Sequence, residues 1–114
     1  MVDKDAGYLL DMLLASREAA QFAADLHDED AFRQSRLHQH AIMRLLGIVG
    51  EAANGVSSAV QDQMPGIPWK DIIGMRHRLI HGYGAVRLHV VWGVVTIELP
   101  ALIVLLEERV VGDQ

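Results

Sequence analysis

The feature that most constrains the fold is the spacing of apolar residues between positions 36 and 56. Apolar side chains recur there in alternating steps of three and four residues: Leu37, Ala41, Leu45, Ile48, Ala52 and Val56. This spacing places them all on one face of a helix with 3.6 residues per turn. We therefore predict a helix over residues 36–56 whose apolar face is buried.

Three further helices are predicted along the chain. Residues 4–26 carry a polar residue at every seventh position and leucines on the opposite side. The polar segment HDEDAFRQS then forms a loop or a single turn. After the breaker MPGIP a third helix spans residues 68–81, with Gly82 suited to a left-handed C-terminal position. The fourth helix begins near residue 88 and must kink or restart at Pro100, which lacks an amide donor.

The fold class follows from these elements. The segment VRLHVVWGVVTI is rich enough in β-branched residues to be read as a hairpin, but its turn signal is weak. Gly47 and Gly50 lie inside the predicted second helix, where each indicates close approach of another helix. We predict an all-α bundle of four or five helices that forms a single domain over residues 1–114.

Composition and charge limit the classes of function. Half of the residues are apolar (51%), and the absence of cysteine excludes a disulfide framework and a thiolate zinc site. A formal charge of -5 argues against binding of nucleic acid over the whole surface. Residues 88–106 approach the length of a membrane span, but they contain His89, Glu98 and Pro100, so we predict a buried helix. We expect a cytoplasmic protein with no membrane partner.

Two arginines and two histidines lie close together in the segment RHRLIHGY, residues 76–83, within a stretch that has no Asp or Glu between residues 72 and 97. Arg76 falls on the apolar arc of the predicted third helix, where it needs a carboxylate, a subunit interface or a cleft. Glu51 is a candidate for that carboxylate, or else a solvated helix charge. Trp69 and Trp92 lie in apolar runs, which favours core or interface anchors over platforms for base stacking.

Three interpretations of the cluster remain open. Cations near a helix C-terminus stabilise the helix dipole, which suits Arg78 but does not explain an arginine on the apolar side. His77 and His81 have the spacing of metal ligands, yet Arg78 stands where a hydrolytic zinc helix carries glutamate, so no metal site is expected. The third interpretation is general acid–base cleavage of RNA, in which histidine moves protons and arginine holds the phosphate.

The same segment resembles a known family. RHRLIHGY fits the R-x4-H-x-Y signature of the HepT-like group (DUF86) in the HEPN superfamily. The likeness extends over about residues 8–110 through three ordered segments, IVGEAANGV, MPGIPWKDIIGMRHRLIHGY and VVWGVVTIELPALIVLLEE. It implies a HEPN-type helical bundle that dimerises so that two R-x4-H motifs meet in a cleft. Where the group commonly has asparagine after the motif arginine, this chain has His77.

The resemblance also implies a function and roles for individual residues. Such proteins are typically metal-independent ribonuclease toxins of toxin–antitoxin pairs, with no cofactor. Their antitoxin is a minimal nucleotidyltransferase (MNT) that in some systems adds AMP to the motif tyrosine. Arg76 would steady the RNA phosphate, His81 would be the acid–base group, and Tyr83 would be the modification site, with His77, Glu51 and Arg78 in possible support. The alternative is a catalytically inactive HEPN module that only binds a nucleotidyltransferase partner or a nucleotide.

Overall fold

The computed structural model describes residues 3–81 and 84–112, and within these ranges it contains helices and no strand. The elements are α1 (Lys4–Ala24), α2 (Glu29–Gln34), α3 (Arg36–Gly55), α4 (Ser58–Gln63), α5 (Trp69–Ile73), α6 (Met75–His81), α7 (Gly84–Gly93), the π-helical segment η1 (Val94–Glu98) and α8 (Leu99–Gly112). The all-α prediction is confirmed. The hairpin alternative is wrong, because its residues lie in α7 and η1.

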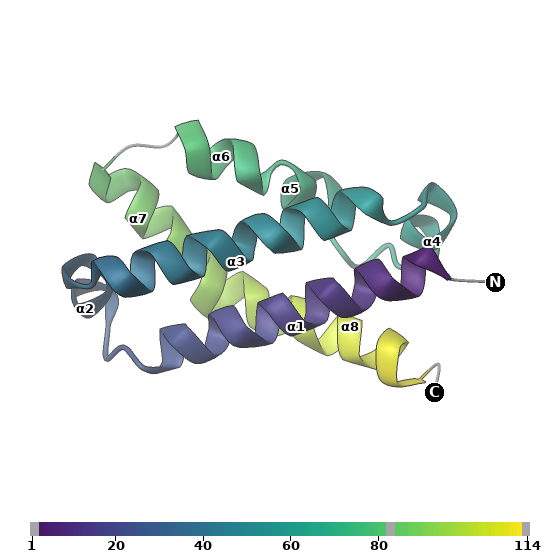
Figure 1. Cartoon of the computed structure of the whole chain (residues 1–114), viewed down its shortest axis with the longest axis horizontal. Helices are drawn as coiled ribbons and strands as arrows, with labels where there is room; N and C mark the ends of the chain where they lie inside the picture. Colours follow the sequence, from purple (N-terminus) through teal and green to yellow (C-terminus); the bar gives the residue numbers. More distant parts are fainter. Residues whose placement is uncertain (1–2, 82–83, 113–114) are drawn as a thin grey trace.

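The two long helices α1 and α3 lie side by side and form the centre of the molecule (Figure 1). On one side α8 and η1 pack against α1, and on the other α5 and α6 pack against α3. The short helix α2 contacts α7 at one end of the bundle. The molecule is elongated, with extents of 45 × 26 × 22 Å, so α3 presents a long flank beside α6.

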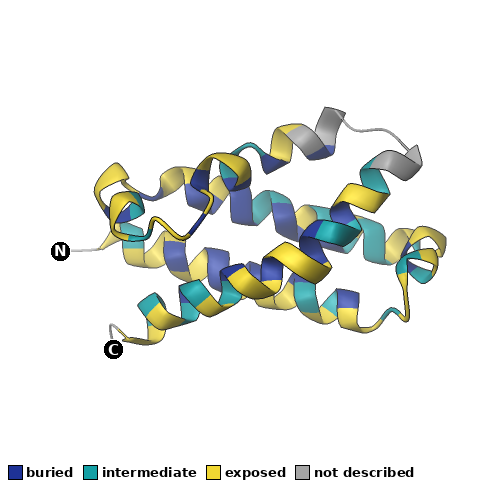
Figure 2. Cartoon of the chain, turned by 180° about the vertical axis from the view of Figure 1, so that it is seen from behind, coloured by how far each residue is buried: buried dark blue, intermediate teal, exposed yellow. Residues whose placement is uncertain are grey.

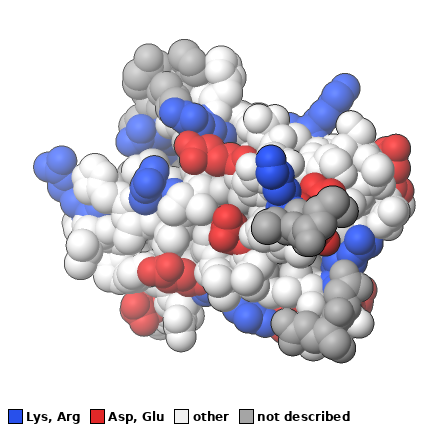
Figure 3. Space-filling model, turned by 45° about the vertical axis from the view of Figure 1, so that its right-hand side comes forward, with Lys and Arg blue, Asp and Glu red and all other residues white. Residues whose placement is uncertain are grey.

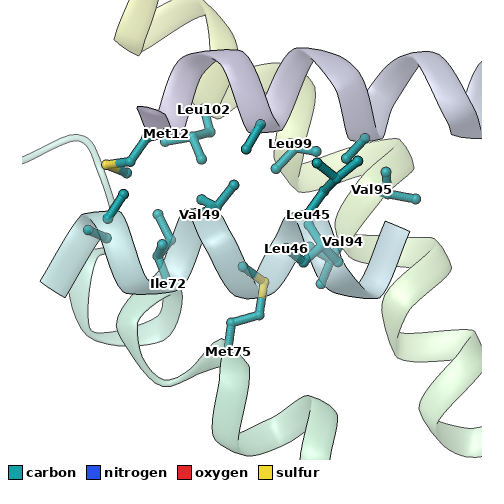
Figure 4. Packing of buried hydrophobic residues seen from close by; sticks show 14 of the residues in the cluster. Met12, Leu45, Leu46, Val49, Ile72, Met75, Val94, Val95, Leu99 and Leu102 are labelled. Atoms are coloured by element: carbon teal, nitrogen blue, oxygen red, sulfur yellow. The ribbon is translucent and has the colours of Figure 1, made fainter. Parts of the chain in front are cut away.

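The core is built from aliphatic and methionine side chains, as the low aromatic content requires. Buried residues from α1, α3, α5, α6, η1 and α8 pack around α3 (Figure 4), and the central ones include Met12, Leu46, Val49, Ile72, Met75, Val95 and Leu99. Trp69 is buried, and its indole N–H donates to the Met64 carbonyl at 3.0 Å. Trp92 is half-buried and stacks on Phe32 with ring centres 5.4 Å apart. Both tryptophans are therefore core anchors, as predicted.

Side-chain caps explain where several helices begin. Asp3, Asp28, Ser35 and Ser57 each accept a hydrogen bond from a backbone N–H in the first turn of the helix that follows. Asp5 in α1 also accepts bonds from the Ser57 backbone N–H (2.8 Å) and hydroxyl (2.7 Å). The Ser57 backbone bond is the main reason why the pKa of Asp5 lies below its usual value. This contact attaches the start of α4 to α1.

The structure departs from the sequence prediction at three places. Residues 29–34, expected as a loop or single turn, form α2, whose Phe32 side chain is completely buried. Helix α4 was not predicted. The helix expected over residues 68–81 is divided at Gly74 into α5 and α6, at a residue type that weakens a helix by about 1 kcal/mol relative to alanine.

The C-terminal helical run passes through Pro100 without a break in its helical course. Directly before the proline the backbone widens into η1, where the Leu99 N–H bonds to the Val94 carbonyl five residues earlier. Because proline donates no hydrogen bond, this is where the chain adapts to the missing donor. A kink of the helix axis at Pro100 stays a prediction.

Only one face of this run is buried. Away from the buried side, four exposed apolar residues recur at seven-residue intervals: Val90, Ile97, Val104 and Val111, with exposed fractions of 41%, 74%, 55% and 57%. We call these four residues the apolar stripe. Figure 2 shows exposed and buried positions alternating along the run. The segment Arg87–Gly112 is long and apolar enough to span a membrane, and 28% of its apolar 18-residue window is buried, so the predicted buried helix is correct for one face only.

The two glycines of α3 have opposite surroundings. A Cβ at Gly50 would lie 3.0 Å from the backbone carbonyl oxygen of Ile72, which confirms the predicted close approach of α5. A Cβ at Gly47 would meet no atom within 4 Å, so the same prediction is wrong there. Gly47 instead borders a surface groove.

These surroundings predict stability changes of opposite sign. Gly47→Ala should raise the free energy of unfolding by about 0.5–1 kcal/mol, because alanine favours the helix and fits the open space. Gly50→Ala should lower it by about 1–3 kcal/mol, because the added methyl pushes α5 away from α3. Urea denaturation of the two variants checks both signs. Equal effects of the two substitutions would contradict the assigned helix contact.

Candidate functional site

Helix α6 carries the motif residues from Arg76 to His81 and runs beside α3. The described residues of α3, α6 and α7 enclose a groove of about 530 Å³, lined by His40, Met43, Arg44, Gly47, Glu51, Arg76, Leu79 and Arg87. On α3 the lining residues follow the spacing i, i+3, i+4, i+7 and i+11 from His40, so they occupy one face of that helix. The groove thus joins the motif helix to a face of α3 that faces solvent.

Arg76 lies in this groove and not in the core. Its side chain is 62% exposed, and its Nη1 lies 3.2 Å from Oε1 of Glu51, which is 52% exposed. The prediction that Arg76 sits among buried apolar residues is wrong, because α6 covers only one edge of α3 and leaves this side of α6 open. Arg76 was expected to need a carboxylate, a subunit interface or a cleft. The structure provides a carboxylate, Glu51, and an open groove. Glu51 is the partner of Arg76, as the first interpretation has it, but it is an exposed and solvated helix charge and not an internal carboxylate.

This ion pair is weak enough to be exchanged. Exposed pairs of Arg and Glu contribute about 0.2–1 kcal/mol. A phosphate offers the guanidinium two parallel charge-assisted hydrogen bonds and more negative charge than one carboxylate. Arg76 can therefore leave Glu51 for a phosphate at little cost.

Two further arginines face the same groove from different helices. Arg44 is exposed on α3, and Arg87 is half-buried on α7. Among the described residues no hydrogen bond or ion pair engages Arg44, and the Arg87 Nε is buried without a partner. Three guanidinium groups thus stand against a single carboxylate in the described lining. On the face in Figure 3 positive and negative side chains are interspersed.

The other predicted site residues lie on or next to α6. His77 is exposed on that helix. His81 is the last residue of α6, five positions after Arg76 and about 7.5 Å farther along the axis. The side chains of Arg78 and His81, and the whole of Tyr83, lie outside the described residues. Within the described ranges no three His, Cys, Asp or Glu side chains are grouped so as to hold a metal ion.

Sequence reasoning missed His40 and Arg44 as site residues. Their signal is present in the sequence, since His40, Arg44, Gly47 and Glu51 share one face of the predicted second helix. Apart from Met43, the α3 residues that line the groove are polar or glycine. What the sequence lacked was the position of α6 and α7 beside this face.

Comparisons with known proteins place the chain among its relatives. A protein-family model described as Ribonuclease HepT-like matches residues 12–109. A "Probable ribonuclease HepT" of Thermococcus cleftensis is 34% identical over 83% of this chain and 86% of its own length. A chain of Methanocaldococcus jannaschii named "Putative RNase MJ1380" is 28% identical over the same shares. No solved structure matches.

The match covers α6, the groove residues and nearly all of the bundle, so it concerns the whole fold and not the motif alone. The resemblance inferred from R-x4-H-x-Y and its flanking segments is confirmed. The chain belongs to the Ribonuclease HepT-like family.

Proposed function

We propose that this chain is a metal-independent endoribonuclease that cleaves RNA with Arg76 and His81 in a dimer cleft, as the cytoplasmic toxin of a toxin–antitoxin pair. The observation that carries the proposal is the exposed Arg76 of the family motif, which lies in a groove with two other arginines. A groove of this charge on a chain with a formal charge of -5 favours an anionic substrate at this place only.

The chemistry needs two proton transfers and one cation. A base removes the proton of the 2′-hydroxyl, whose oxygen attacks the phosphorus, and an acid protonates the departing 5′ oxygen. The products are a 2′,3′-cyclic phosphate and a free 5′-hydroxyl. Histidine changes protonation near neutral pH and can serve as base or acid. Arg76 would hold the non-bridging phosphate oxygens and stabilise the charge that develops on them.

One copy of the motif supplies one His81, so the proposal places two copies in the site. The apolar stripe supports this arrangement, because apolar residues at seven-residue intervals suit packing against an equivalent helix. A two-fold axis along the stripe would pair the run from α7 to α8 of one subunit in parallel with the same run of its partner. The two α6 motifs would then lie at the same end of the dimer, near Arg87 and Val90.

The proposed antitoxin is a minimal nucleotidyltransferase that adds AMP to Tyr83. Tyr83 follows His81 by two residues, so an adduct there would lie near the end of α6. It would add bulk and negative charge close to the position proposed for the RNA phosphate. Both effects would oppose RNA binding.

Cleavage of single-stranded RNA by the purified chain, with and without excess chelator, tests the proposal. We expect equal rates in the two conditions and products that end in a 2′,3′-cyclic phosphate. Loss of cleavage in chelator would overturn the metal-independent mechanism. Absence of cleavage in both conditions would favour the inactive interaction module.

A further inference from the structure

We infer that the groove beside the motif is an extended phosphate-binding site for the RNA strand that flanks the cleaved bond, with Arg44 and Arg87 as its phosphate-binding residues. The inference rests on the proposed ribonuclease function and adds residues outside the R-x4-H motif. It starts from the three arginines that reach one groove from α3, α6 and α7.

The pairing of the three arginines separates their roles. Arg76 is engaged by Glu51 at 3.2 Å. Arg44 and Arg87 have no carboxylate partner within the described part of the chain. A surface this short of counter-charges attracts anions, and arginine is suited to phosphate through its planar set of donors.

The length of the groove argues for a strand and against a single phosphate group. Its α3 side extends from His40 to Glu51, which is about 16 Å along a helix axis. A fully stacked strand, as in duplex DNA, advances about 3.4 Å per phosphate. A less stacked single strand advances farther, so this length accommodates a few nucleotides. Arg44 lies seven residues, or about two helical turns, before Glu51 on α3. Glu51 in turn holds Arg76. A strand bound at Arg76 would therefore pass Arg44.

Gly47 leaves the middle of this path open. It lies between Arg44 and Glu51 on the same face of α3, and a Cβ there would meet no atom within 4 Å. A longer side chain at position 47 would project into the groove without disturbing the packing of α3. This permits a test of the site that changes no charge.

Binding of a short single-stranded 2′-O-methyl RNA tests the inference, because the blocked 2′ oxygen prevents cleavage. Each phosphate contact to a single strand contributes about 0.7 to the slope of log affinity against log salt. Arg44→Gln and Arg87→Gln should each lower that slope by about 0.7 and weaken binding about fivefold at 0.1 M salt. Arg44→Lys should restore most of the slope. Gly47→Leu should weaken binding tenfold or more.

Arg17→Gln is the matched control, since Arg17 lies on α1 and pairs with Glu107 of α8 outside the groove. It should bind as the unchanged chain does. With cleavable RNA, Arg44→Gln and Arg87→Gln should raise KM and leave kcat within about twofold, because neither touches the reacting phosphate. Folding of each variant is verified by circular dichroism.

The inference would be overturned if RNA affinity and its salt dependence did not change in Arg44→Gln, Arg87→Gln and Gly47→Leu. Equal losses in Arg17→Gln would also overturn it. Failure of the proposed ribonuclease function would give a different result. The chain would still bind the 2′-O-methyl RNA in the groove, but it would not cleave the unmodified RNA. The binding and cleavage assays thus distinguish the two failures.

Discussion

His81→Ala is expected to lower the rate of RNA cleavage by about 10²- to 10⁴-fold, the usual contribution of a general acid or base. RNA binding should change little, because the arginines of the groove stay in place. His81 ends α6, and alanine is a good helix former, so the fold should be retained. Single-turnover cleavage at saturating RNA measures the effect apart from binding.

The matched control is His77→Ala on the same helix. His77 stands where the family commonly has asparagine, and we expect it to fill that position without moving a proton. Its variant should keep cleavage within about tenfold, well short of the loss expected for a general acid or base. Cleavage that survives in His81→Ala and disappears in His77→Ala would transfer the acid–base role to His77. If both variants still cleaved RNA, neither histidine of α6 would take part in the mechanism.

Ile97→Asp should separate the proposed dimer into folded monomers that no longer cleave RNA. Ile97 is 74% exposed in the single chain, so aspartate is tolerated there before association. In a paired stripe the carboxylate would be buried without a partner, at a cost of about 3 kcal/mol or more. The dimer Kd should therefore rise more than a hundredfold. Sedimentation velocity and the cleavage assay, run at the same protein concentration, measure both effects.

Leu37→Asp provides the control for this substitution. Leu37 is also 74% exposed, but it lies at the start of α3 and outside the apolar stripe. It should leave the oligomeric state and cleavage unchanged. Dimers that persist in Ile97→Asp would place the subunit interface elsewhere. Monomers that still cleave would show that one motif is sufficient.

The long helices could be predicted closely because their signals are local. The predicted helices over residues 4–26 and 36–56 correspond to Lys4–Ala24 and Arg36–Gly55. Periodic apolar residues and capping side chains lie within each segment and need no tertiary information. Helix α4 is different, since the carboxylate that holds its start belongs to Asp5, 52 residues earlier in the chain.

The motif residues could be recognised from sequence, but the groove could not. Arg76, His81 and Tyr83 follow one another at fixed spacing, whereas Arg44 and Arg87 become neighbours only when α3 and α7 are in place. Gly47 and Gly50 make the same point, because identical residues three positions apart meet solvent in one case and a carbonyl oxygen in the other. Residue type and spacing specify which residues share a face of a helix. Whether that face is buried or lines a groove depends on the helices that pack beside it.

The wide turn before Pro100 has a consequence for how the length of this chain can vary. Helix α8 continues from α7 through η1, so the orientation of its side chains depends on the number of residues in that turn. A π-turn holds one residue more than an α-turn, so removing one residue from η1 would leave a regular α-helix with α8 close to its present orientation. Removing one residue from the α-helical turns of α7 would instead rotate α8 by about 100° relative to the start of α7. Leu99, Leu102 and Leu106, which are buried, would then be turned away from α1 and α3. A one-residue deletion should therefore be far more disruptive in the α-helical turns of α7 than in η1 or in the polar connection between α1 and α2.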